Sequence, residues 1–155
     1  MGTRSSIAMK TEDGIRAIYC HWDGYIDHNG RILKEFYSTD EKVKALLDLG
    51  DLSSLRQEIG EQQDFDAKYK ENPELPMFEN WRLAYGRDRG ETDVEAQTFE
   101  DVKTWVEAEA ERWCEYFYLW DGRDWIVSNG KMDADGYPEF DFLEVAILKE
   151  ITATA

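Results

Sequence analysis

The chain has 155 residues, of which 42% are hydrophobic and 14% aromatic; this fits one folded domain, residues 1–155, and excludes a disordered acidic chain. Acidic residues number 34 against 18 Lys and Arg, and the formal net charge of -16 disfavours binding to nucleic acid or to anionic membranes. No apolar run is long enough to span a bilayer, and residues 1–10 lack the apolar stretch of a signal peptide, so we expect a cytoplasmic protein.

Residues 7–20 predict an antiparallel β-hairpin, because Asp13-Gly14 suits a tight turn between two stretches of alternating apolar residues. The alternation places two sets of side chains on opposite faces of this hairpin. The first set is Ile7, Met9, Ile18 and Cys20, and the second is Ala8, Lys10, Ala17 and Tyr19.

The segment that follows, from Trp22 to Gly30, contains or adjoins every His in the chain, His21 and His28. Strand alternation points Cys20 and His21 to opposite faces, which argues against a shared metal and against a nucleophile–base pair. We interpret Asp23-Gly24 as a turn that ends the strand. Two hypotheses stay open for this loop. It is a contact surface formed by Trp22, Asp23 and Tyr25, or a metal site formed by His21, Asp23, Asp27 and His28.

The middle of the chain predicts two short helices and a long polar connection. Residues 31–37 and 38–50 show helical spacing, and the second helix has a Ser38 to Glu41 capping box and a terminating Gly50. Residues 57–80 are polar and contain two Pro, which predicts a loop or insertion within the domain. Residues 80–91 predict a strand ending in a charged turn.

Residues 98–113 give the clearest helical pattern, with Thr98 as the expected N-cap and Trp113 on the apolar face. From Asp88 to Glu115 there are ten acidic residues against Arg89, Lys103 and Arg112. The opposite side of the helix is therefore expected to be an acidic surface. Its residues are Glu100, Asp101, Glu107, Glu109 and Glu111.

Residues 114–128 predict a second hairpin that turns at Asp121-Gly122, with Tyr118 facing Trp125 and Tyr116 facing Val127. Residues 140–151 fit either a helix or a strand. The order of elements indicates an α+β domain, in which a mainly antiparallel sheet with two β-hairpins packs against two or three helices. Cys20 and Cys114 are expected to be reduced, packed thiols.

The segment from Asp133 to Glu144 partly follows the calcium-binding loop of an EF-hand, with Glu144 at position 12. However, Gly136 falls at position 4 instead of 6, and Tyr137 occupies a position that normally supplies an oxygen ligand. We therefore expect an acidic turn, with Asp133 and Asp135 available for contact with a partner.

Several phrases resemble a family of small phage and prophage proteins: "GTRSSIAM", "AIYCHWDGY", "LGDLSSL", "LAYGRDRGE" and "EYFYLWDGRDWIV". The resemblance covers most of the chain outside the polar middle. It implies a phage-type origin and no particular chemistry.

Two functions fit these features. The first is an acidic, non-enzymatic inhibitor without a cofactor, which binds a basic, nucleic-acid-handling surface of a bacterial defence enzyme such as a CRISPR effector or a restriction nuclease. Imitation of DNA phosphates by carboxylates is one route to such binding. The alternative is a small metal-dependent hydrolase that uses His21, Asp23 and His28.

Overall fold

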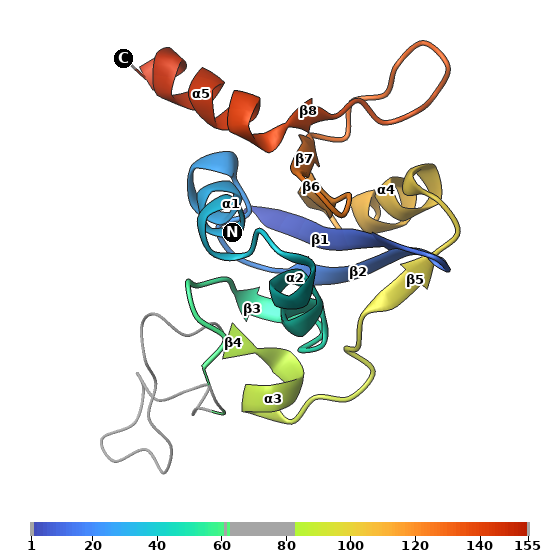
Figure 1. Ribbon diagram of the computed structural model, residues 1–155. Coiled ribbons are helices and arrows are strands. Elements are labelled where there is room, and N and C mark those ends of the chain that lie inside the picture. The colour runs from blue at the N-terminus through green and yellow to red at the C-terminus, as the bar shows by residue number, and fades with distance from the viewer. Residues whose placement is uncertain (1, 61, 63–82, 155) are drawn as a thin grey trace.

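The computed structural model describes residues 2–60, 62 and 83–154. It shows an α+β domain built on one sheet, with the strand order β4-β3-β2-β1-β6-β7-β8 and with β5 paired to β2 (Figure 1). The strands are β1 (Arg4–Thr11), β2 (Gly14–Cys20), β3 (Leu52–Ser54), β4 (Leu83–Ala84), β5 (Gln97–Phe99), β6 (Cys114–Trp120), β7 (Trp125–Ser128) and β8 (Asp141–Phe142). The helices are η1 (Ile26–Gly30), a π-helical turn, and α1 (Arg31–Phe36), α2 (Asp40–Leu47), α3 (Tyr85–Arg89), α4 (Val102–Ala110) and α5 (Leu143–Thr154). Among the described residues no helix is long and apolar enough to cross a bilayer.

Most strand pairs among the described residues are antiparallel, as predicted, but the sheet is mixed and not purely antiparallel. Neighbouring strands of both predicted hairpins run antiparallel, but β1 runs parallel to β6 and β2 runs parallel to β3. The parallel β1–β6 pair joins the two hairpins into one sheet, although about a hundred residues separate them. Local turn signals specify hairpins, whereas they carry no information on how two hairpins meet.

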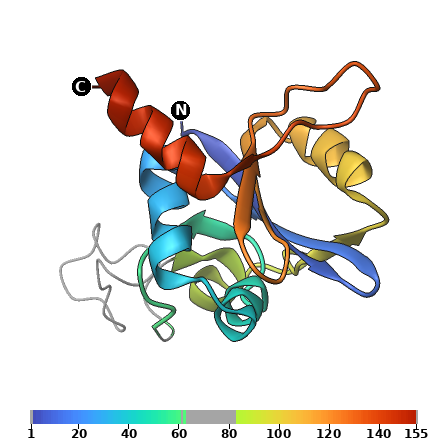
Figure 2. The ribbon, with the colours of Figure 1, turned by 45° about the horizontal axis from the view of Figure 1, so that its top comes forward.

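The first hairpin forms as predicted, with Ile7 opposite Ile18 and Ala8 opposite Ala17, but its two-residue turn is Glu12-Asp13 and not Asp13-Gly14, because Thr11 pairs with Gly14. This shift by two residues leaves every side chain on its predicted face. The two faces of the hairpin pack into two separate hydrophobic clusters, as the alternation indicated. One cluster lies under α1, α2 and α5 and contains Ile7, Ile18, Cys20, Leu33, Leu46, Tyr118 and Leu143. The other lies under α4 and contains Ala8, Ala17, Tyr19, Trp105, Phe117 and Leu119. Figure 2 shows α4 on one side of the sheet and α1 and α5 on the other.

The second hairpin exists, but its predicted register is wrong by two residues. Trp120 pairs with Trp125 and Tyr118 with Val127. The turn therefore contains four residues instead of two, because the Asp121 side chain accepts hydrogen bonds from the backbone N–H groups of Arg123 and Asp124 at 2.9 and 2.7 Å. This side-chain turn extends the loop beyond the Asp-Gly pair.

The helix N-caps lie further along the chain than predicted. Thr39, and not Ser38, caps α2 by accepting a hydrogen bond from Lys42 N–H at 3.3 Å. Asp101, and not Thr98, caps α4 by accepting one from Thr104 N–H at 2.8 Å. Thr98 instead belongs to β5, where it pairs with Arg16.

Two further segments differ from their prediction or decide between its alternatives, and a third lies mostly outside the described residues. Of the predicted strand in residues 80–91, the described residues from 83 onward form only the short strand β4. The chain then enters α3, whose Asp88 carboxylate accepts a hydrogen bond from Ala84 N–H at 2.9 Å. The segment 140–151 is mostly helical, since α5 follows the two-residue strand β8. Most of the predicted loop 57–80 lies outside the described residues.

Candidate functional site

The exposed side of α4 carries most of the predicted acidic surface. Glu107 and Glu111 are exposed, four residues apart, and thus lie on the same side of the helix. Glu100 and Asp101 are also exposed but precede the first turn. Hydrogen bonds from Thr104 lower the pKa of Asp101, which keeps this carboxylate ionised. Four of the five predicted acidic residues therefore face solvent.

Glu109 is the exception and corrects the prediction. It is only 3% exposed, and its carboxylate lies 3.3 Å from Nη1 of Arg112. Its position on α4 turns it toward the sheet, because buried Trp105 lies four residues earlier on the same side. Glu109 is thus part of the interior and cannot contact a partner.

Arg112 lies between Glu109 and a second buried carboxylate, Asp51. Nη2 of Arg112 is 3.3 Å from Oδ2 of Asp51, and Asp51 Oδ1 accepts a hydrogen bond from Tyr19 N–H at 2.9 Å. The guanidinium carbon also lies 4.4 Å from the centre of the Tyr19 ring, a cation–π contact. The cluster therefore fixes the end of α4 against β2 and the segment before β3.

The electrostatics of this cluster reflect burial and partial compensation. Burial raises the pKa of Asp51 and of Glu109, and Arg112 opposes the shift in both. Burial disfavours the charge of Arg112, but the two carboxylates raise its pKa. Two carboxylates share one guanidinium, so neither has a full ion pair of its own.

Trp113, the residue after Arg112, has its side chain exposed to solvent. Trp113 is 75% exposed, although the sequence predicted it on the buried face of the helix. The reason is that α4 ends at Ala110, and Trp113 adopts a left-handed conformation with φ of +69°. Its N–H donates to the carbonyl of Ala110 at 3.0 Å. A left-handed backbone is unfavourable for a residue with a bulky side chain.

Trp113 borders a hollow of about 330 Å³ that is also lined by Gly2, Arg4 and Glu115. Trp22 lies close to the same N-terminal segment, since a Cβ atom added to Gly2 would lie 2.5 Å from the indole of Trp22. Trp22 is 43% exposed. The structure thus brings the predicted loop and the end of the predicted acidic helix to the same edge of the molecule.

The rest of that loop is held by backbone contacts. Gly24 N–H donates to Thr3 O at 2.8 Å, and Asp23 adopts a positive φ of +56°, consistent with the predicted turn. Tyr25 is 41% exposed. We call Glu100, Asp101, Glu107, Glu111, Trp113 and Glu115 the α4 surface. Trp22 lies near its Trp113 end through Gly2, and Asp23 and Tyr25 follow Trp22 in the loop.

The residues of the alternative metal site have other partners. His21 Nδ1 lies 2.8 Å from the Tyr19 hydroxyl, His28 Nδ1 lies 2.9 Å from Asn29 Oδ1, and Asp27 forms an ion pair with Arg31 at 2.6 Å. Cys20 is buried on the opposite face of β2, as predicted, and Cys114 is also a buried, free thiol. No three His, Cys, Asp or Glu side chains converge within the described ranges.

The segment from Asp133 to Tyr137 forms a tight acidic turn. Asp133 Oδ1 accepts hydrogen bonds from the N–H groups of Asp135 and Tyr137 at 2.9 and 3.0 Å. The Lys103 ammonium lies 5.6 Å from the centre of the Tyr137 ring, which places this turn beside the first turn of α4. Glu144 lies in the first turn of α5.

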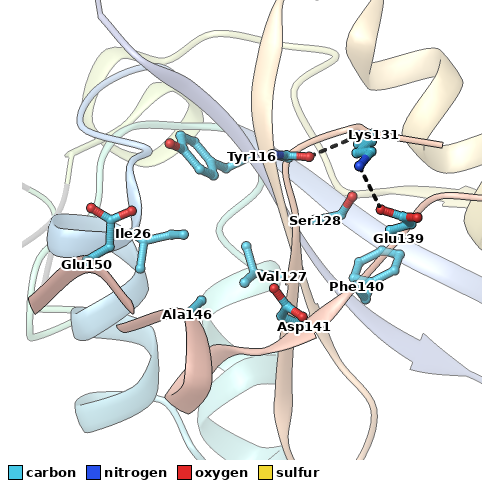
Figure 3. Close-up of a pocket in the computed structure, with 11 residues that line it drawn as sticks. Ile26, Tyr116, Val127, Ser128, Lys131, Glu139, Phe140, Asp141, Ala146 and Glu150 are labelled. Atoms are coloured by element: carbon cyan, nitrogen blue, oxygen red, sulfur yellow. Dashed lines mark hydrogen bonds and ion pairs between the residues drawn. The ribbon is translucent and has the colours of Figure 1, made fainter. Parts of the chain in front are cut away.

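A second hollow, of about 240 Å³, lies between α5, β7 and residues 128–141 (Figure 3). Its charged residues are largely matched within the chain. Lys131 lies 3.8 Å from Glu139, and Lys149 lies 3.3 Å from Asp141. Glu150 and Tyr116 complete the polar wall, and burial followed by the charge of Glu150 raises the pKa of Tyr116.

Sequence reasoning missed three residues that shape the α4 surface: Asp51, Arg112 and Arg4. Arg112 offered one usable signal, because it is the only cation between Glu107 and Glu115. Asp51 offered none, since its role depends on a contact across 61 positions.

Comparison of the chain with protein-family models, with curated proteins and with solved structures finds no match, so the resemblance to phage and prophage proteins stays a prediction.

Proposed function

We propose that this protein uses the α4 surface to bind a basic, nucleic-acid-handling surface of a host bacterial defence enzyme, and that binding inhibits that enzyme in the host cytoplasm. The observation that carries the proposal is the left-handed, 75% exposed Trp113 between the carboxylates of Glu111 and Glu115. Backbone strain at an exposed aromatic residue is typical of a site with a function beyond stability.

The chemistry of this surface matches a cationic partner. Carboxylates attract Lys and Arg side chains over distances set by the Debye length, and an exposed indole can stack on a guanidinium. Trp is also among the residues that contribute most to protein–protein binding. An Arg-rich groove that normally holds nucleic acid would present both features that this surface recognises.

The buried cluster beneath supports the proposal through preorganisation. Arg112 is held by Asp51 and Glu109, so the chain on either side of Trp113 is fixed before any partner arrives. A surface that is already ordered loses less conformational entropy on binding. In the view of Figure 2, no other helix of the described residues lies beside the outer side of α4.

The test is a pull-down from bacterial lysate at about 0.1 M and about 1 M salt, followed by identification of the partner and a direct binding and nuclease assay. Since the Debye length falls from about 10 Å to about 3 Å over this range, we expect capture at low salt and release at high salt. The triple variant Glu100→Lys, Glu107→Lys, Glu111→Lys should lose binding and inhibition while keeping its circular dichroism spectrum.

The matched control reverses three other exposed carboxylates: Glu12→Lys, Glu35→Lys, Asp124→Lys. Both triple variants change the net charge equally, so only a site-specific effect separates them. Equal binding of both variants would exclude the α4 surface. The loop around Trp22 and the turn at Asp133 and Asp135 would then be the next surfaces to test.

A further inference from the structure

The C-terminal helix α5 exposes an apolar side. Val145, Leu148 and Ile151 are 42%, 58% and 46% exposed, and Phe142, immediately before the helix, is 58% exposed. The opposite side is the packed one, with Leu143 and Ala146 at 1% and 5% exposure. Figure 3 shows Ala146 and Glu150 on the wall of the hollow beneath α5, and Figure 1 shows the helix extending away from the sheet.

The exposed side follows the pattern of a short parallel coiled coil. If Val145 and Thr152 occupy a positions, Leu148 occupies d and Lys149 occupies e. The two g positions are Glu144 and the apolar, 46% exposed Ile151, which extends the apolar side. A β-branched residue at a with Leu at d favours two parallel strands. The packed residues Leu143, Ala146 and Ile147 fall at f, b and c, on the outside of such a pair.

The charges on the two flanks also favour the parallel arrangement. In a parallel pair, the g residue of one helix lies beside the e residue five positions later in the other, so Glu144 of each chain meets Lys149 of its partner. In an antiparallel pair, g residues would lie beside g residues and e residues beside e residues. Both contacts between Glu144 and Lys149 would then be lost. Lys149 lies 3.3 Å from Asp141 within its own chain, but both groups are exposed, so this ion pair is weak.

We infer that the exposed side of α5 binds a second copy of this chain as a parallel, two-fold symmetric helix pair. The surface is distinct from the α4 surface, since α4 and α5 lie on opposite faces of the sheet. Twelve residues span only about 18 Å, so the contact is well below the area of a standard interface and the dimer is transient, forming at about 0.1 to 1 mM protein.

Salt dependence separates this dimer from the proposed function. Each chain carries a formal net charge of -16, so the two copies repel each other. Salt screens this repulsion more than it weakens the hydrophobic contact between the two helices. Dimerisation should therefore strengthen between about 0.1 and 1 M salt, whereas binding of a basic partner to the α4 surface should weaken. If either the dimerisation or the partner binding does not show its expected salt dependence, the other can still be interpreted.

The first experiment is sedimentation velocity of the full chain across this concentration range at both salt concentrations. Lys149→Glu and Glu144→Lys should each weaken association about tenfold, because each replaces two attractive contacts by two repulsive ones. The double variant Glu144→Lys, Lys149→Glu should restore it. Lys10→Glu, an equal charge change on an exposed residue of β1, is the control and should have no such effect.

The second experiment fixes the direction of the pair. Val145→Cys and Leu148→Cys should each form an intermolecular disulfide on mild oxidation, because only a parallel pair in register places both residues beside their own copies; Cys20 and Cys114 are buried. A monomer at 1 mM in both salts, or absence of rescue by the double variant, would overturn the inference. Disulfide formation at one position only would indicate an antiparallel contact and contradict it equally.

Discussion

Nη2 of Arg112 lies 3.3 Å from Oδ2 of Asp51, a contact between the end of α4 and the segment before β3. This contact connects α4, which carries the acidic surface, to the part of the sheet formed by β3 and β4. The same guanidinium reaches Glu109 at 3.3 Å, so one side chain compensates two carboxylates. Rigid presentation of Trp113, the next residue, depends on this arrangement.

Arg112→Ala should lower the free energy of unfolding by about 2–3 kcal/mol. The substitution leaves two buried carboxylates without their counter-charge, and the value lies below that of a fully buried pair because the Arg112 side chain is 41% exposed. Urea denaturation at pH 7 measures it. Arg123→Ala, in the exposed turn after β6, is the control and should change stability by less than about 0.5 kcal/mol.

Glu109→Gln should change how stability depends on pH. Burial raises the pKa of Glu109 and of Asp51 in the folded protein. As the pH rises, these two carboxyl groups therefore lose their protons in the unfolded chain, at about pH 4, before they do so in the folded protein. Their contribution to stability is therefore greatest below about pH 4 and declines with rising pH until the folded pKa is passed. The variant should show a shallower decline between pH 4 and 7 in urea denaturation, and identical slopes would contradict a raised pKa for Glu109.

Trp113→Gly should be more stable than Trp113→Ala, although both remove the indole. A non-Gly residue in the left-handed region costs roughly 1–2 kcal/mol, and Gly regains this but loses about 0.4–1 kcal/mol through its more flexible unfolded chain. The expected advantage of Gly is about 1 kcal/mol in thermal or urea denaturation. Both variants should bind the basic partner equally weakly; a less stable Gly variant would show that the strain at φ of +69° is not real.

Gly14→Ala should destabilise the protein more than Gly122→Ala. Both glycines have positive φ, at +131° and +97°. A Cβ atom on Gly14 would lie 2.2 Å from the carbonyl oxygen of Phe99 in β5, whereas nothing lies within 4 Å of one on Gly122. We expect a loss of about 2–4 kcal/mol at Gly14 and about 1–2 kcal/mol at Gly122 in urea denaturation. Similar losses would argue against close contact between β2 and β5.

The sequence by itself determined the local elements, because their signals act over a few residues. Alternation around Asp13-Gly14 specified the first hairpin and which of its residues share a face, and the 3.6-residue spacing specified the helices around Leu46 and Trp105. It also established the acidic character of the protein and the opposite orientations of Cys20 and His21. These properties follow from backbone geometry and composition.

Only the tertiary structure decided how these elements meet and which charged groups are buried. The parallel pairing of β1 with β6 and the helical state of α5 depend on packing between distant segments, which no local pattern encodes. Glu109 is acidic and lies on the expected helix, yet it is buried because Arg112 compensates its charge there. Trp113 is apolar and continues the helical spacing, yet it is exposed because the backbone leaves the helix at Ala110. In both cases a long-range contact or a backbone turn outweighed the preference of the side chain itself.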